Sequence, residues 1–179
     1  MTPRFALVVA LALLASAGPA AAQYRPAEKS EWEIEQEKRD WKEGEVKLPA
    51  FFKGDDLIEF QVARTTSLRF YIDPASLSVG ADGVVRYTLV ARSPSGAENV
   101  SYEGLHCKTS SHRIYALGQG NGTWKQVTAD WKPASTLWAR VLRREFFCPS
   151  QLSIFSTAEG LDALRRGGHP DMERLRTGR

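Results

Sequence analysis

Hydrophobic and polar residues alternate with period two from residue 57 to residue 127, and this pattern predicts β-strands. The predicted strands are residues 57–62, 69–73, 77–79, 84–92, 99–107, 113–117 and 123–127. In the strand 84–92 we expect Val85, Tyr87, Leu89 and Ala91 to face the core. Turn residues separate neighbouring strands, as at Asp82-Gly83, so the strands should pair as an antiparallel meander. Pro74 should end the strand before it, because proline cannot donate to a strand ladder.

After Pro133 the period of the apolar positions changes from 2 to 3.6 residues, which is typical of a helix. We predict one main helix that starts at Ser135 or Thr136 and ends near Cys148. A capping box at Ser156–Glu159 opens a second, short helix that stops at Gly167, beyond which we expect a frayed end. The fold class is therefore α+β, an antiparallel β meander of five to seven strands packed with one main C-terminal helix.

The N-terminus has the organisation of a secretory signal peptide. One basic residue, Arg4, precedes 13 small or apolar residues and the sequence Ala20-Ala21-Ala22-Gln23. This apolar run is too short to span a bilayer, and small residues precede the expected cleavage between Ala22 and Gln23. We therefore expect a cleaved signal peptide, a periplasmic location in the bacterial cell envelope, and no transmembrane segment in the mature protein.

Two cysteines, Cys107 and Cys148, both lie in the exported part of the chain. In an oxidising compartment the simplest outcome is one disulfide between them. The alternative is a reactive thiol or a metal ligand, since His106 and His112 lie near Cys107. No spacing typical of a metal site supports that alternative, so we predict neither a metal nor a cofactor.

Charge is distributed unevenly along a chain whose formal net charge is only +3. Residues 23–47 carry eight acidic and six basic side chains and predict a flexible arm or a solvated helix, with Trp32 and Trp41 available to bind a partner. Residues 131–179 carry nine basic and five acidic side chains, which favours an anionic surface or an envelope protein as the partner. We do not expect nucleic acid as a partner, because the protein is exported and has no stacking platform.

The sequence carries no motif of nucleophilic or zinc-dependent catalysis. Carboxylates near strand ends leave an envelope hydrolase open as an alternative; they are Asp73, Asp82, Glu98 and Glu103. The main hypothesis is a non-enzymatic binding or envelope-associated module, with a working surface at Tyr102 and Glu103. An assembly partner of an envelope complex, which binds through the arm at residues 23–47, is a further alternative. Cross-strand packing is the competing interpretation of that pair.

Several segments together resemble the cryptic neisserial protein-like family of exported bacterial proteins. The most specific is the run Ser-Gly-Ala-Glu-Asn-Val-Ser-Tyr-Glu-Gly at residues 95–104, and weaker matches are Leu48-Pro49-Ala50, residues 69–77, Gly83–Thr88, Trp124 and Phe147-Cys148-Pro149. The resemblance implies an exported, single-domain protein and supplies no catalytic residues. We divide the chain into a signal peptide (1–22), a charged arm (23–47), a family-like domain (48–150), and a short helix with a basic tail (151–179).

Overall fold

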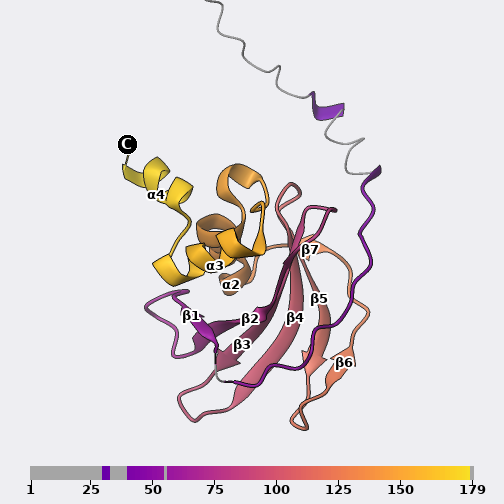
Figure 1. Cartoon of the computed structure of the whole chain (residues 1–179), viewed down its shortest axis with the longest axis vertical. Helices are drawn as coiled ribbons and strands as arrows, with labels where there is room; N and C mark the ends of the chain where they lie inside the picture. Colours follow the sequence, from indigo (N-terminus) through magenta and orange to yellow (C-terminus); the bar gives the residue numbers. More distant parts are fainter. Residues whose placement is uncertain (1–29, 33–39, 55, 178–179) are drawn as a thin grey trace, which may run out of the picture.

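Seven strands form one antiparallel sheet in the part of the chain that the computed structural model describes, residues 30–32, 40–54 and 56–177. Six of them pair in sequence order, and the seventh lies beside β5 (Figure 1). The strands are β1 (Ile58–Phe60), β2 (Arg69–Val79), β3 (Val84–Arg92), β4 (Glu98–His106), β5 (Ser111–Gly118), β6 (Trp124–Gln126) and β7 (Lys132–Pro133). The predicted meander is confirmed. The signal peptide and its cleavage site at Ala22 and Gln23 lie outside the described residues.

Pro74 does not end a strand, contrary to the expectation from the sequence. β2 continues to Val79, and its register against β3 shifts between Asp73 and Ser78. Pro74 lies in this irregular stretch, where the ladder does not need its missing N–H group. Two strands predicted separately are therefore one strand with a bulge.

In the described part of the chain, five helices form the C-terminal layer, and the first two run without a break over residues 137–147, where the one main helix is predicted. They are α2 (Leu137–Val141), the π-helix η1 (Leu142–Phe147), the 3-10 helix η2 (Pro149–Gln151), α3 (Thr157–Arg166) and α4 (Pro170–Thr177). The predicted N-cap forms, since the Ser156 hydroxyl accepts from the amide of Glu159, while the Glu159 carboxylate accepts from the amide of Phe155 rather than from that of Ser156. The end predicted to fray contains α4, where the amide of Asp171 donates to Nδ1 of His169. None of the helices among the described residues is long and apolar enough to cross a bilayer.

The main hydrophobic core lies between the sheet and this helical layer (Figure 1). Val85, Tyr87, Leu89 and Ala91 of β3 all belong to it, which confirms the predicted core face. From the helices the core receives Leu142, Phe146 and Phe147, among others. The predicted disulfide is present, and Cys107 and Cys148 join the end of β4 to the end of η1.

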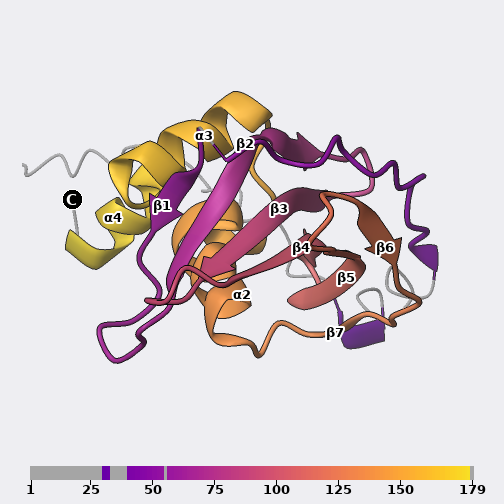
Figure 2. The ribbon, with the colours of Figure 1, turned by 90° about the horizontal axis from the view of Figure 1, so that it is seen from below.

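Residues 40–53, which we call the strap, run along the sheet on the side away from α3 and α4 (Figures 1 and 2). Val46 and Leu48 of the strap pack against a second cluster of Tyr102, Tyr115 and Ala116. This cover explains why almost every residue of β3 is buried, on both faces of the sheet. Residues of the strap before residue 48, which the sequence assigns to the charged arm, thus pack against the sheet.

Candidate functional site

The predicted surface pair, Tyr102 and Glu103, does not lie on the surface. Tyr102 is 3% exposed and Glu103 is fully buried. As neighbours in β4, they project to opposite faces of the sheet. The prediction of a joint working surface is therefore wrong, because helices cover one face and the strap covers the other.

Glu103 lies on the helix-covered face with hydrogen bonds to both of its carboxylate oxygens. Oε1 accepts from the Ser101 hydroxyl at 2.6 Å, and Oε2 accepts from Tyr87 Oη at 3.2 Å and Trp138 Nε1 at 3.1 Å. His112 Nε2 lies 2.7 Å from the same Oε2. Burial, followed by the neighbouring Glu103, raises the pKa of the Tyr87 phenol well above its usual value. A buried carboxylate with this many partners acts as a structural centre of the core.

On the opposite face, Glu43 of the strap receives donors from three parts of the fold. Arg113 Nη1 and Tyr115 Oη, both from β5, each lie 2.5 Å from a carboxylate oxygen, and Arg86 Nη2 from β3 lies at 3.4 Å. Trp131 Nε1 completes the set at 3.2 Å. Burial, with the hydrogen bond to Glu43, raises the pKa of Tyr115. We call Glu43 together with its four donors the Glu43 clamp. The clamp holds the strap on the sheet.

A second anchor of the strap is Asp82 in the β2–β3 turn. Its backbone carbonyl accepts from Trp41 Nε1 at 2.8 Å, and its Oδ2 accepts from the amide of Gly44 at 2.8 Å and from Arg86 Nη2 at 2.6 Å. The Trp41 ring also stacks on His106, with 4.3 Å between centroids. Trp41 is therefore engaged within the fold and does not present the free partner anchor that the sequence suggested.

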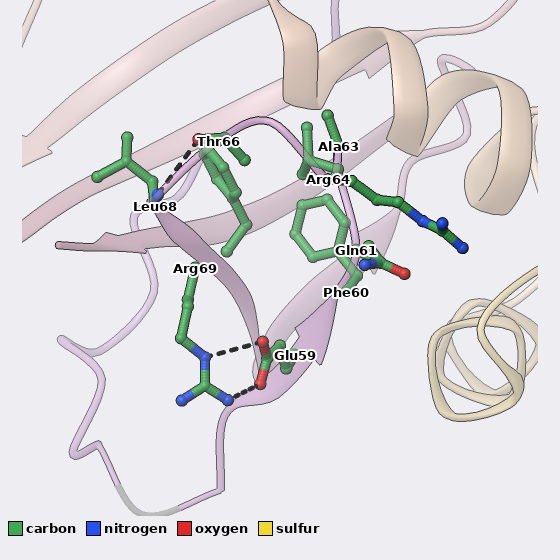
Figure 3. A pocket seen from close by; sticks show the side chains of 10 residues that line it. Glu59, Phe60, Gln61, Ala63, Arg64, Thr66, Leu68 and Arg69 are labelled. Carbon is green, nitrogen blue, oxygen red and sulfur yellow. Dashed lines mark hydrogen bonds and ion pairs between the residues drawn. The ribbon is translucent and has the colours of Figure 1, made fainter. Parts of the chain in front are cut away.

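The largest of the described cavities lies at the β1–β2 loop, residues 61–68 (Figure 3). Its volume is about 580 Å³, and its lining comes from the loop together with the facing ends of β1 and β2. Phe60 and Phe70 supply buried rings that pack on Phe146 and Trp138 of the helical layer, with centroids 5.9 Å apart in each case. The cavity thus borders two aromatic side chains of the main core, both of them almost completely buried.

Polar groups lie on two sides of this cavity. At one side Glu59 accepts two hydrogen bonds from the guanidinium of Arg69. This hydrogen bonding lowers the pKa of the Glu59 carboxyl group. Figure 3 shows Gln61 and Arg64 pointing to another side, away from that pair. Arg64 is exposed and has no hydrogen-bond or ion-pair partner among the described residues. The cavity therefore combines two buried aromatic neighbours with one unpaired positive charge.

This cavity was not predictable from the amino-acid sequence, because residues 63–68 carry neither strand periodicity nor a chemical motif. The only signal was the gap between two predicted strands, which the loop fills. For the Glu43 clamp a signal did exist, since Gly104 interrupts a strand and such glycines mark bulges or close approaches. Among the described residues, no group of three or more His, Cys, Asp or Glu side chains is arranged to hold a metal ion.

Comparison with known proteins matches residues 36–165 to the CNP1-like family. A segment of 77 residues is 31% identical to Cryptic neisserial protein 1 of Neisseria gonorrhoeae (strain ATCC 700825 / FA 1090). That match covers 36% of this chain and 38% of the relative, so it spans well under half of either protein. No solved structure matches the chain. The family match begins before the strap, includes the whole sheet and both cysteines, and ends within α3.

Proposed function

The chain belongs to the CNP1-like family, and we propose that this protein is exported to the periplasm and acts there by binding a ligand rather than by catalysis. The ligand site is the cavity at the β1–β2 loop. The ligand is a small amphipathic molecule with an apolar body and an anionic group. The carrying observation is the unpaired Arg64 at the side of a cavity that borders two buried aromatic side chains.

The cavity has the size of small-molecule sites, and its lining is more polar than is usual for them. Such sites measure about 300–1,000 Å³ and combine a mainly apolar lining with a few polar groups that orient the ligand. Here Phe60 and Phe70 border the cavity, while Gln61 and Arg64 supply a donor pair at one side. A guanidinium binds a carboxylate, sulfonate or phosphate through charge-assisted hydrogen bonds.

The contacts of the acidic residues favour binding over an envelope hydrolase that uses carboxylates. General acid catalysis needs a carboxyl group whose pKa is raised. The carboxylate in this cavity, Glu59, has a lowered pKa and a firm partner in Arg69. Glu103 lies in the filled core, where a substrate has no room.

Export is supported by two separate features of the chain. The first 22 residues have the organisation of a signal peptide. The disulfide between Cys107 and Cys148 is the kind of bond that persists in an oxidising compartment. Cleavage after Ala22 would leave a mature chain that begins with Gln23, which N-terminal sequencing of the periplasmic fraction tests.

Envelope association is the second part of the proposal, with an anionic surface or an envelope protein as the partner. The net positive charge of residues 131–179 supports it. An assembly role through the arm has less support, because Trp41 is held by Asp82 and His106.

Fluorescence titration of the mature protein with 8-anilinonaphthalene-1-sulfonate tests the ligand site, because this probe joins an aromatic body to a sulfonate. We expect Arg64→Gln to weaken binding about tenfold, the equivalent of one charge-assisted hydrogen bond. Lys125→Gln, which removes an exposed charge from β6, is the matched control and should leave the affinity unchanged. Equal affinities for the wild type and Arg64→Gln would refute the site.

A further inference from the structure

The loop between η2 and α3 exposes two large apolar side chains within four residues. Phe155 is 88% exposed and Leu152 is 62% exposed. Between them Ile154 is almost completely buried, at 1%. Elsewhere among the described residues, the large apolar side chains exposed to a comparable degree are Trp32 and Leu117. Within the part of the chain that the structure describes, this loop is therefore the one place where two such side chains share a short segment.

A local cause explains why Phe155 has no packing partner. It precedes the N-cap Ser156, where an apolar side chain normally packs on the fourth residue of the helix as a hydrophobic staple. That residue is Gly160, which has no side chain. Nor is there room for one, because a Cβ atom at Gly160 would lie 2.6 Å from Cδ1 of Ile154. Ile154 takes the space under the helix, and Phe155 is left in solvent.

The backbone of the loop is nevertheless held in place. The amide of Ile154 donates to the carbonyl of Phe147 at 3.0 Å, and the amide of Phe155 donates to Oε2 of Glu159 at 2.6 Å. A fixed backbone lowers the entropy that is lost when an exposed side chain is buried against a partner. The loop therefore holds the backbone of Phe155 in a fixed position.

Basic residues lie in the helical segment 137–147, whose last residue accepts a hydrogen bond from the amide of Ile154 in this loop. A chain of contacts leads from Phe155 to Glu159, from Glu159 to His169 at 2.9 Å, and from the amide of His169 to the carbonyl of Glu145 at 2.7 Å. Arg144 is the neighbour of Glu145, and Arg140 precedes it by one helical turn. Both arginines are exposed and have no partner among the described residues.

The acidic side chains of this region are already engaged. Glu159 pairs with His169, and Asp171 pairs with Arg174. Glu145 is half-buried and has a partner. Among the described residues of this region, the exposed charges without a partner are thus those of Arg140, Arg144 and Arg165.

We propose that this face, made of Leu152, Phe155, Arg140 and Arg144, docks onto an anionic lipid bilayer. Leu152 and Phe155 enter the boundary between headgroups and acyl chains, and the two guanidinium groups bind lipid phosphates. Apolar insertion joined to basic residues is the combination by which peripheral proteins bind such membranes. This inference rests on the proposed envelope association and not on the ligand cavity, so its failure would leave the cavity untouched.

Sedimentation with vesicles tests the proposal on the mature protein, residues 23–179. One set of vesicles contains phosphatidylcholine alone, and the other contains about one third phosphatidylglycerol. We expect binding to the anionic set, weakened about tenfold by Phe155→Ala because the buried apolar area is lost. Arg140→Gln with Arg144→Gln should weaken it about 25-fold, since each basic residue near an anionic surface adds about fivefold.

Leu117→Ala is the matched control, because it removes an exposed leucine from β5 and should leave vesicle binding unchanged. Thermal unfolding of each variant checks that the fold is intact. Absence of wild-type binding, or equal binding by Phe155→Ala, would overturn the proposal. So would equal binding to the neutral vesicles, or a wild-type dimer that Phe155→Ala converts to a monomer in solution.

Discussion

Two glutamates illustrate how identical side chains take different tasks in this protein. Glu103 is fully buried and organises the polar centre of the core, with donors from β3, β4 and the helical layer. Glu43 lies in the strap and is held by donors on the opposite face of the sheet. Each carboxylate has several donors, which compensate for the loss of water around its charge. Both residues therefore stabilise packing between parts of the chain that are distant in sequence.

Asp82 yields a prediction at the residue scale. Burial alone would raise the pKa of its carboxyl group, but hydrogen bonds from Arg86 and from the amides of Gly44 and Val84 outweigh burial and hold the pKa below the ordinary 3.8. Asp82→Asn should lower the free energy of unfolding by about 2–3 kcal/mol at pH 7, the value of a hydrogen bond to a charged group.

The pH dependence of this effect follows from the lowered pKa. The carboxylate contributes its full stabilisation above the pKa of the unfolded chain and loses it as the pH falls through the lower pKa of the folded state. The difference between the wild type and Asp82→Asn should thus be constant from pH 7 to pH 5 and shrink below pH 4. Urea unfolding at pH 7, 5 and 3 measures it, with Asp56→Asn as an exposed control. A difference that grows in acid would contradict the assignment.

At the scale of elements, a bulge in β5 positions the Glu43 clamp. Tyr102 pairs with Ala116 and Glu103 pairs with Ile114, so Tyr115 is the extra residue. Its free carbonyl accepts from the amide of Val127 at 2.9 Å. The Tyr115 side chain passes over Gly104, where a Cβ atom would lie 2.4 Å from the phenol oxygen. Bulges commonly redirect a side chain in this way.

Gly104→Ala should therefore disturb the bulge and the strap together. We expect a loss of about 2–3 kcal/mol in the free energy of unfolding, in the range of an overpacked core. Gly120→Ala is the control, because nothing lies within 4 Å of a Cβ atom there and its backbone needs no positive φ. Chemical denaturation compares the two variants. Equal stability of Gly104→Ala and the wild type would show that Tyr115 moves aside at little cost.

The whole molecule consists of a curved sheet with different covers on its two faces. Helices close one face with an apolar core, and the strap closes the other with aromatic rings and ion pairs. The disulfide fastens the helical cover to the end of β4, and both cysteines are buried. The proposed ligand cavity and the proposed lipid-docking face both lie at the margins of the helical layer, where this cover meets solvent.

Removal of the disulfide tests how far the helical cover depends on it. The bond closes a loop with a sequence separation of 41 residues. The double variant Cys107→Ala, Cys148→Ala should lose about 4 kcal/mol in the free energy of unfolding on the chain-entropy account. Urea unfolding measures this, and a reducing agent should destabilise the wild type while leaving the double variant unchanged. A variant as stable as the wild type would show that packing alone holds the helices.

The strands, the core face of β3 and the start of α3 could be predicted because their signals are local. Period-two alternation and a capping box depend on residues a few positions apart. The disulfide followed from the count of cysteines and the expected compartment. The continuity of β2 through Pro74 was not predictable in the same way, since it depends on a register shift against β3.

The candidate sites were missed for a related reason. In the Glu43 clamp, Glu43 contacts residues that are 43 to 88 positions away in the sequence. No periodicity in the arm predicts these contacts. From the sequence, Tyr102 and Glu103 were expected to form an exposed binding surface. In the fold the strap buries Tyr102 on one face of the sheet, and the helices bury Glu103 on the other. The exposure of Phe155 depends on how Ile154 fits beneath Gly160, which is a matter of packing.

The strands, the helix start and the disulfide thus followed from short-range rules of backbone geometry, capping and cysteine chemistry. These rules can be applied to the amino-acid sequence alone. Which surfaces stay open is a different kind of property. It depends on which segments cover the sheet, and burial is decided by contacts among residues far apart in the chain. For that reason the element order and the disulfide were predictable from the residues, whereas the strap, the cavity beside Arg64 and the exposed loop at Phe155 emerged from the folded arrangement.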